Sequence, residues 1–539
     1  MAAITAVPGG EQAHREQTRV RTHVALIVFS GLLVRALFYL AYKPIWAGDS
    51  PSYTLAYYFW AHRQFYLGER TPIYPLMLGL AQWVNREHAS ILPGFAVAYT
   101  TLVWQAILNI LTCVGFYFTL LWLRVRRGMA LAASIVLVTL AGLCWYEMQI
   151  LNMALAFTFV TVIAGCYVAL LRRIEAARRC GPLALATGGM LGIAVLVRPE
   201  LLIFTVVLVL GTAALRMTAL GKHQVRGRKF LASALLMMIG VAPLLLLWMA
   251  AMYAGIGEFR ITTLDGWNTS RTVYNLFDRV GPEDRALGEV LSRSYAAQLT
   301  HGNQVNVREH MFIAFDDLEA HYNEFPIDHS VALRPSEMNV KIARLAFDYL
   351  GLERIPCAVS QQMTCFENMR ARIDLGDYIG GVSSKLMRRY PGAWARNILV
   401  NWLQETFNFS YVDRKEAVAG FQAITVDGST YVRRPRLSKV VEWAVRVEDP
   451  LLSLAYVVTL LFAMLGPVLL VRDKPLSSAD AAVVLLAMAA VGTEAVMCAI
   501  AGFNRIYSLP FVAIFVLCAA FGVERRRDVL PTSPQKAED

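Results

Sequence analysis

The sequence predicts an all-α polytopic membrane protein with about ten transmembrane helices and a mostly helical extracytoplasmic domain. The chain of 539 residues is 56% hydrophobic and 17% charged, whereas globular domains carry about 25% charged residues. Its mean hydropathy is +0.46. Long uncharged runs recur along the chain, and most approach the roughly 20 residues that a bilayer-spanning helix needs.

Ten segments are predicted to cross the membrane. With the N-terminus inside, every short basic cluster between them falls on one side, which follows the positive-inside rule. We therefore expect both termini in the cytoplasm, as tails at residues 1–23 and 524–539. The apolar run after residue 23 is too long for a signal peptide, so we expect it to stay uncleaved. The ten segments are residues 24–42, 94–122, 129–147, 149–171, 182–198, 200–216, 230–254, 451–471, 478–502 and 506–523.

Spans one to seven thus occupy residues 24–254 and spans eight to ten occupy residues 451–523, with two long segments left outside. In the first, residues 43–93, Ser50-Pro51 and Thr71-Pro72 are typical helix starts. The aromatic residues after Ser50 favour a helix in the membrane interface. The second segment, residues 255–450, is long enough for an extracytoplasmic domain. Apolar stripes at 342–350 and 394–403 predict helices there, the latter interfacial.

The net charge of +11 is a consequence of this topology and does not favour a nucleic-acid partner, because the basic residues lie in the short gaps between spans. Of the eight cysteines, Cys357 and Cys365 alone fall in the outer domain. An oxidising compartment favours a disulfide between them. Two unpaired, buried thiols are the alternative.

Several charged and polar residues are predicted to meet at the outer mouth of the bundle. Charge at a membrane edge is costly and is often functional. Arginines suit a phosphate, because the guanidinium donates in a fork, and a nearby carboxylate can serve as a general base. Arg35 lies within the first span, below this level. The residues at the mouth are Asp49, Arg70, Glu147, Arg198, Arg505 and Tyr507.

Each of these residues also has a structural interpretation. Asp49 could cap the helix that follows it, and Glu147 could form an ion pair with Arg35 or Arg198. Arg198 and Arg505 could anchor lipid headgroups, and Arg70 could be a solvated loop charge.

Five motifs, in this order, resemble those of the GT-C glycosyltransferases, integral-membrane enzymes that use polyprenyl-phosphate sugars. The branch with protein O-mannosyltransferases and the lipid A aminoarabinose transferase is the most similar. The resemblance covers roughly the membrane part, and it departs at Asn504, where an acid is common, and at Arg70, where the lipid A branch has Lys. The motifs are Asp49, Glu69-Arg70-Thr71-Pro72, Glu147, Leu196-Val197-Arg198-Pro199 and Arg505-Ile506-Tyr507-Ser508-Leu509-Pro510.

This resemblance implies an inverting transfer of a sugar from a polyprenyl-phosphate donor to a hydroxyl acceptor on the outer face. The acceptor would be a glycan, a lipid or a protein. Asp49 would be the base, and Glu147 would orient the acceptor or Asp49. Arg70 and Arg198, with Arg505 and Tyr507, would bind the donor phosphate. We expect a location in the bacterial inner membrane.

No cofactor is expected. Some relatives bind a metal near the first loop, but neither Glu69 nor the histidines at 301, 310, 321 and 329 have ligand spacing. A transporter or flippase for a lipid-linked or anionic substrate is the alternative function. It is disfavoured because no internal repeat is visible and the charges gather at the mouth, not at the midplane. A non-catalytic scaffold is a third possibility.

Overall fold

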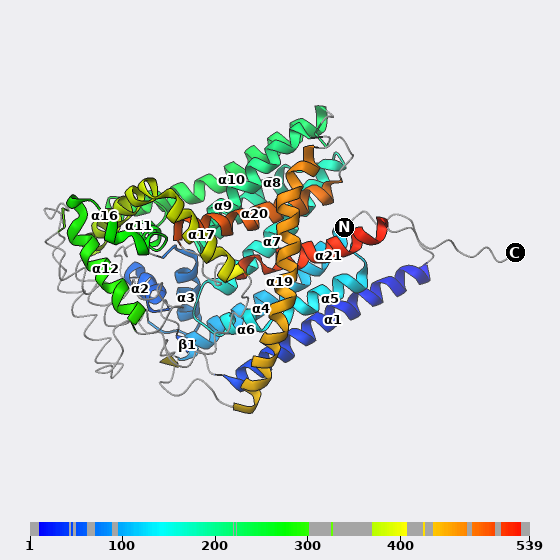
Figure 1. Ribbon diagram of the computed structural model, residues 1–539. Helices are drawn as coiled ribbons and strands as arrows, with labels where there is room; N and C mark the ends of the chain where they lie inside the picture. Colours follow the sequence, from blue (N-terminus) through cyan, green and yellow to red (C-terminus); the bar gives the residue numbers. More distant parts are fainter. Residues whose placement is uncertain are drawn as a thin grey trace.

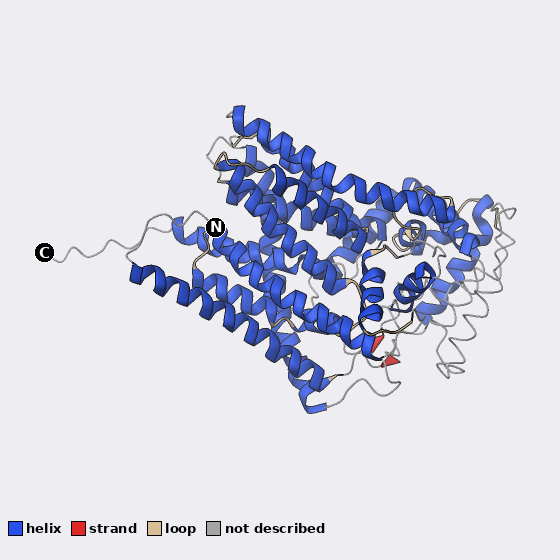
Figure 2. Ribbon diagram, turned by 180° about the vertical axis from the view of Figure 1, so that it is seen from behind, coloured by secondary structure: helices blue, strands red, loops and turns tan. Residues whose placement is uncertain are grey.

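The computed structural model describes most of the membrane part and part of the outer segments. The described residues are 10–42, 45–46, 50–61, 70–88, 95–218, 220–221, 224–300, 325–326, 369–406, 424–425, 435–471, 477–501 and 508–529. Figure 1 shows a bundle of long helices with shorter helices gathered at one end, and Figure 2 shows the helical character from behind. We name the end with α11, α12 and α16 the outer end, and the end where α1 begins and α21 finishes the inner end.

Six described helices are long and apolar enough to cross a membrane, and the chain is a multi-pass membrane protein. A seventh span results if α5 and α6, which meet at a 43° bend, count as one. The six are α1 (Gly10–Ala41), α4 (Phe95–Trp122), α7 (Met153–Glu175), α10 (Gln224–Ile256), α19 (Pro435–Val471) and α20 (Ser478–Ala501); the bent pair is α5 (Arg127–Val138) and α6 (Ala141–Glu147).

The predicted number of ten spans is not confirmed, although each expected segment overlaps a helix. α8 (Gly181–Val197) and α9 (Leu201–Ala214) are apolar but shorter than a full crossing, even with η1 (Leu215–Met217) continuing α9. α21 (Val512–Val529) has 18 residues, and its last turns hold a run of charges from Glu524 to Asp528. The all-α membrane fold is confirmed, while the count depends on how these short helices sit in the bilayer.

The bend between α5 and α6 has a local cause. Thr139 ends α5, and its hydroxyl donates back to the carbonyl of Ile135 at 2.8 Å. The first amide of α6, on Ala141, donates to both carboxylate oxygens of Glu448 on α19, at 2.8 and 2.9 Å. A carboxylate at a helix N-terminus satisfies a donor that has no partner within the helix. Glu448 thereby fixes the start of α6, and Glu147 is the last residue of this helix.

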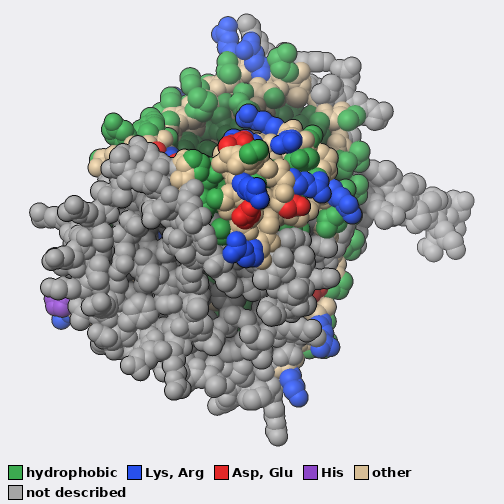
Figure 3. Space-filling view, turned by 60° about the vertical axis from the view of Figure 1, so that its left-hand side comes forward, with side chains coloured by type: hydrophobic (Ala, Val, Ile, Leu, Met, Phe, Trp, Pro, Cys, Tyr) green, Lys and Arg blue, Asp and Glu red, His purple; other side chains and the backbone are tan. Residues whose placement is uncertain are grey.

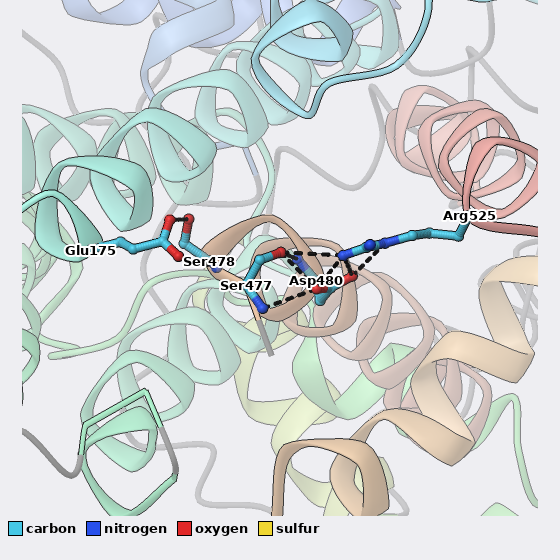
Figure 4. Close-up of polar contacts among 5 residues, drawn as sticks. All are labelled: Glu175, Ser477, Ser478, Asp480 and Arg525. Atoms are coloured by element: carbon cyan, nitrogen blue, oxygen red, sulfur yellow. Dashed lines mark hydrogen bonds and ion pairs between the residues drawn. The ribbon is translucent and has the colours of Figure 1, made fainter. Parts of the chain in front are cut away.

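Polar contacts also tie the inner end of the bundle together (Figure 4). Arg525 on α21 donates to both carboxylate oxygens of Asp480 at the start of α20, at 2.5 and 2.6 Å. Ser478 donates to Glu175, the last residue of α7, at 2.5 Å. These contacts join the inner ends of three helices, α7, α20 and α21.

The described outer helices enclose a second apolar core. α11 (Asp265–Ser270) lies against α16 (Met369–Arg389) so closely that a Cβ on Gly266 would fall 1.8 Å from the carbonyl oxygen of Gly376. Only a residue without a side chain permits this approach. The other elements are η2 (Tyr274–Arg279), η3 (Pro282–Asp284), α12 (Arg285–Thr300) and α17 (Pro391–Thr406).

Polar contacts accompany this core. Asp284 is buried and accepts hydrogen bonds from Tyr378 at 3.0 Å and from Lys385 at 2.8 Å. The bond to Asp284 raises the pKa of Lys385 above its ordinary value. A two-residue strand pair, β1 (Ile45–Trp46) with β2 (Ile424–Thr425), joins the first outer segment to the second.

Candidate functional site

Arg70 lies in the first outer segment, where two short helices meet. α2 (Ser50–Ala61) packs on α3 (Ile73–Val84) because Gly79 leaves room for the ring of Tyr57; a Cβ there would be 1.9 Å from that ring. The guanidinium carbon of Arg70 is 4.8 Å from the ring centroid of Tyr53 on α2. Tyr53 in turn meets the edge of Tyr74 on α3, at 4.9 Å between centroids. Two aromatic rings therefore set the position of Arg70.

The carbonyl of Val197 joins this segment to the rest of the bundle. α8 ends at Val197, and the last carbonyls of a helix lack partners within it. The hydroxyl of Thr71 donates to the Val197 oxygen at 3.1 Å, and the side-chain amide of Asn152 donates to it at 2.7 Å. One oxygen thus holds together the residue after Arg70, the residue before Arg198 and the N-cap of α7.

Arg198 stands in the turn between α8 and α9. Its backbone is extended, at φ −147° and ψ 114°, as the following Pro199 requires. Its side chain is buried and forms an ion pair with Glu200, and it also donates to the sulfur of Met153 on α7. The bond to Glu200 gives this buried cation a counter-ion at the mouth.

Glu147 ends α6 and forms a buried ion pair with Arg35 of α1. Arg35 Nη2 lies 2.5 Å from Glu147 Oε1, and the side chains are 5% and 2% exposed. Asn109 on α4 donates to the same oxygen at 2.8 Å, and Thr158 on α7 donates to Asn109 Oδ1 at 2.6 Å. Arg35 also donates to the carbonyl of Val138 at 2.9 Å. Of the two pairings that the sequence allowed for Glu147, the one with Arg35 forms.

Gln105 connects the ion pair with the Arg70 segment. Its amide nitrogen donates to the backbone carbonyl of Glu147 at 3.1 Å, and its Oε1 accepts from the hydroxyl of Tyr74 at 3.3 Å. Tyr74 contacts Tyr53, the ring beneath Arg70. A continuous series of side-chain contacts therefore runs from Arg35 to Arg70.

The carbonyl of Val197 joins the segments that carry Arg70 and Arg198, and Gln105 and Tyr74 link Glu147 to the Arg70 segment. The other predicted residues, Asp49, Arg505, Tyr507, Cys357 and Cys365, lie outside the described residues. Six cysteines in the described part of the chain are free thiols. The Cys357–Cys365 disulfide therefore stays a prediction, as do the roles of Asp49, Arg505 and Tyr507.

Sequence reasoning missed the polar residues that support the cluster. Gln105 and Asn109 stand four residues apart in a predicted span, so they share one helix face, and buried amides in a membrane segment require partners. That spacing was a usable signal. Glu494 is a further buried acid, 1% exposed, within the apolar helix α20. Among the described residues, no group of three or more His, Cys, Asp or Glu side chains is arranged to hold a metal ion.

Two groups of solved structures are similar to the chain. The archaeal oligosaccharyltransferase AglB from Archaeoglobus fulgidus, solved with an inhibitory peptide and a dolichol-phosphate, has a TM-score of 0.48 and 14% identity. The match covers 95% of this chain and 51% of AglB, so the chain spans about half the length of that enzyme. ArnT from Cupriavidus metallidurans, bound to undecaprenyl phosphate, has a TM-score of 0.32 and 14% identity, covering 93% of this chain and 78% of ArnT.

Both proteins are membrane glycosyltransferases of the GT-C superfamily, which the sequence motifs resemble. No protein-family model matches the chain, and no curated protein matches its sequence.

Proposed function

We propose that the chain is a membrane glycosyltransferase that moves a sugar from a polyprenyl-phosphate donor to a hydroxyl acceptor, with inversion. The observation that carries this proposal is the shared bonding of Thr71 and Asn152 to the carbonyl of Val197. It sets the segments of Arg70 and Arg198 side by side at the outer end. Two guanidinium groups on neighbouring backbone segments can grip one phosphate with forked hydrogen bonds.

In this proposal Arg70 and Arg198 bind the donor phosphate and stabilise its charge as it leaves. Tyr53 holds Arg70 in place through its ring face. Glu200 shares Arg198 with the phosphate and keeps that arginine in place when the site is empty. Arg505 and Tyr507, assigned from their motif, complete the phosphate site.

Asp49 is the proposed general base, and it immediately precedes the first residue of α2, Ser50. Its carboxylate accepts the proton of the acceptor hydroxyl as that oxygen bonds to the anomeric carbon. The bond between the anomeric carbon and the phosphate oxygen breaks, and the polyprenyl phosphate departs with the electron pair. The single displacement inverts the anomeric configuration.

Glu147 acts as a positioning residue in this scheme. Its Oε1 is already occupied by Arg35 and Asn109, while its backbone carbonyl holds Gln105, which holds Tyr74 beside Tyr53. Through Gln105 and Tyr74, Glu147 thus fixes the position of the Arg70 segment. The acceptor would be a cell-envelope glycan, lipid or protein on the periplasmic face of a bacterial inner membrane, with both termini in the cytoplasm. The Cys357–Cys365 disulfide belongs to this outer domain.

Purified protein incubated with a panel of radiolabelled polyprenyl-phosphate sugars, with and without a membrane extract, tests the proposal. We expect release of polyprenyl phosphate from one donor class, dependent on acceptor. Arg70→Ala should raise the apparent KM for that donor at least tenfold, since a phosphate contact is lost. Arg86→Asn is the matched control, because Arg86 is exposed at the far end of α3 and Asn tolerates its φ of 56°.

An unchanged donor KM in Arg70→Ala would remove Arg70 from the phosphate site. Movement of intact labelled donor across proteoliposomes, without cleavage of the sugar–phosphate bond, would instead identify a flippase and contradict the transferase.

A further inference from the structure

We name four arginines near the junction of α16 and α17 the arginine collar. Arg279 and Arg389 meet at Tyr390, and Arg388 and Arg396 lie within six residues of Tyr390 in the sequence. α16 ends at Arg389, Tyr390 follows, and α17 begins at Pro391. The guanidinium carbons of Arg279 and Arg389 each lie 5.6 Å from the ring centroid of Tyr390. Two cations from segments far apart in the sequence are therefore brought to one ring.

Among the described residues, the collar arginines have fewer close acidic partners than other basic residues of the outer helices. Arg260 pairs with Asp377 at 2.7 Å, and Lys385 pairs with Asp284 at 2.8 Å. Within the described part of the chain, Arg279 approaches only Asp278, at 3.8 Å with both side chains more than half exposed, and the other three collar residues form no ion pair.

The α16 C-terminus accounts for two collar cations, Arg388 and Arg389, since a helix end favours positive charge. It does not account for Arg279 or Arg396. Like charges held together at a surface with few close counter-ions favour an anionic ligand.

The exposed face of α17 indicates where that ligand lies. Along this face, exposed Arg396 is followed one turn later by Leu399 and Val400, and then by Leu403, which are 52%, 40% and 44% exposed. The opposite face of the helix packs on the membrane bundle, where the indole N–H of Trp402 donates to the hydroxyl of Tyr456 on α19 at 3.3 Å. The exposed face therefore changes from basic to apolar as α17 approaches the membrane helices.

A basic-to-apolar change of this kind is typical of a helix that enters a bilayer from its surface, with cations at headgroup level. From Pro391 to Leu399 the helix rises about 12 Å, so an inclined α17 places the collar near the phosphates when Leu399 is in hydrocarbon. On the described part of the outer face, Lys and Arg side chains gather with a few acids beside hydrophobic side chains (Figure 3).

We propose that the arginine collar is a binding site for the phosphate groups of anionic phospholipids in the leaflet at the outer end. Arg279 and Arg389, aligned by Tyr390, hold one headgroup, and Arg396 marks the boundary with the hydrocarbon. This site is independent of the proposed glycosyl transfer, because its residues take no part in that scheme.

Native mass spectrometry of the full-length protein, titrated with phosphatidylglycerol or phosphatidylcholine, tests this site. We expect the wild type to retain phosphatidylglycerol preferentially. The double variant Arg279→Ala/Arg389→Ala should lose on the order of tenfold in affinity for it. Arg285→Ala, which removes an arginine 79% exposed and paired with Glu289, should change nothing. A second double variant, Arg279→Gln/Arg389→Gln, keeps a polar side chain without the charge and should repeat the loss.

Equal retention of phosphatidylglycerol by the wild type and both double variants would overturn the proposal. Displacement of the bound lipid by a soluble anionic oligosaccharide would also overturn it, because the collar would then be a glycan-binding surface. Neither outcome depends on whether the protein turns over a sugar donor, so a failure of this site is distinguishable from a failure of the proposed function.

Discussion

Acid–arginine pairs hold the bundle at both of its ends, and they use the same groups in different surroundings. At the outer end, Arg35 meets Glu147 at 2.5 Å with side-chain exposures of 5% and 2%. At the inner end, Arg525 meets Asp480 at the same distance with exposures of 48% and 15% (Figure 4). The outer pair is embedded in amides and hydroxyls, while the inner pair faces solvent. Burial, not distance, should therefore decide what each pair contributes.

Removal of one partner from each ion pair should show the largest difference in stability between the two ends. Arg35→Ala leaves the carboxylate of Glu147 buried without its cation, which should destabilise the protein by about 3–5 kcal/mol. Arg525→Ala exposes Asp480 to water and should cost about 1 kcal/mol or less. Thermal unfolding in one detergent measures both variants. Similar losses for the two would show that burial does not distinguish these ends.

A double substitution sharpens the interpretation of the outer pair. Arg35→Met with Glu147→Gln removes both charges and keeps an oxygen that can accept from Asn109. We expect it to recover about 2 kcal/mol relative to Arg35→Ala, because no uncompensated charge remains. The comparison requires the two single variants in the same unfolding assay. A double variant as unstable as Arg35→Ala would mean that lost packing, not charge, is the main cost.

Removal of a hydroxyl hydrogen bond should also destabilise the protein more at the outer end than at the inner end, with smaller losses than removal of a charge. Thr158→Val leaves Asn109 Oδ1 buried without its 2.6 Å donor, at a cost of about 1–3 kcal/mol. Ser478→Ala at the inner end loses the 2.5 Å bond to Glu175, but this carboxylate keeps the backbone amide of residue 478 as a donor, so the change should cost about 0.5–1 kcal/mol. Chemical unfolding of both variants measures the two losses in the free energy of unfolding. A larger loss for Ser478→Ala would reverse the assigned order.

The smallest expected effect is that of salt. At about 1 M salt the Debye length falls to roughly 3 Å, so the part-exposed Arg525–Asp480 pair should lose most of its contribution. The Arg525→Ala variant and the wild type should then unfold alike. The difference between Arg35→Ala and the wild type should persist, because the outer pair is shielded from the ions. Unfolding midpoints measured at low and high salt report both differences.

The sequence was sufficient for the all-α membrane class, while the roles of the predicted site residues stay predictions. The uncharged runs located every described membrane helix, and their basic flanks agree with α1 beginning and α21 ending at one end of the bundle. The predicted topology puts Arg70, Glu147 and Arg198 at one level. In the structure the Val197 carbonyl joins the segments of Arg70 and Arg198, and Gln105 and Tyr74 link Glu147 to the Arg70 segment.

The number of full crossings could not be predicted, because hydropathy does not reveal that α5 breaks at Thr139 or that α8 ends at Val197 before Pro199. The supporting partners were equally hidden. Gln105 and Asn109, which contact Glu147, lie on α4, and Thr158, which donates to Asn109, lies on α7, so these contacts depend on how the helices pack. The choice of Arg35 over Arg198 as the partner of Glu147 is likewise set by packing between α1 and α6.

The most direct test of the account is donor turnover with an acid removed from each end. Asp49→Asn removes the proposed base, and Asp480→Asn removes an acid from the inner end without touching the site. With purified protein and its radiolabelled polyprenyl-phosphate sugar, Asp49→Asn should lower kcat by at least about a hundredfold while donor binding persists, and Asp480→Asn should match the wild type. Full transfer by Asp49→Asn would contradict the assignment of the outer mouth as the catalytic site.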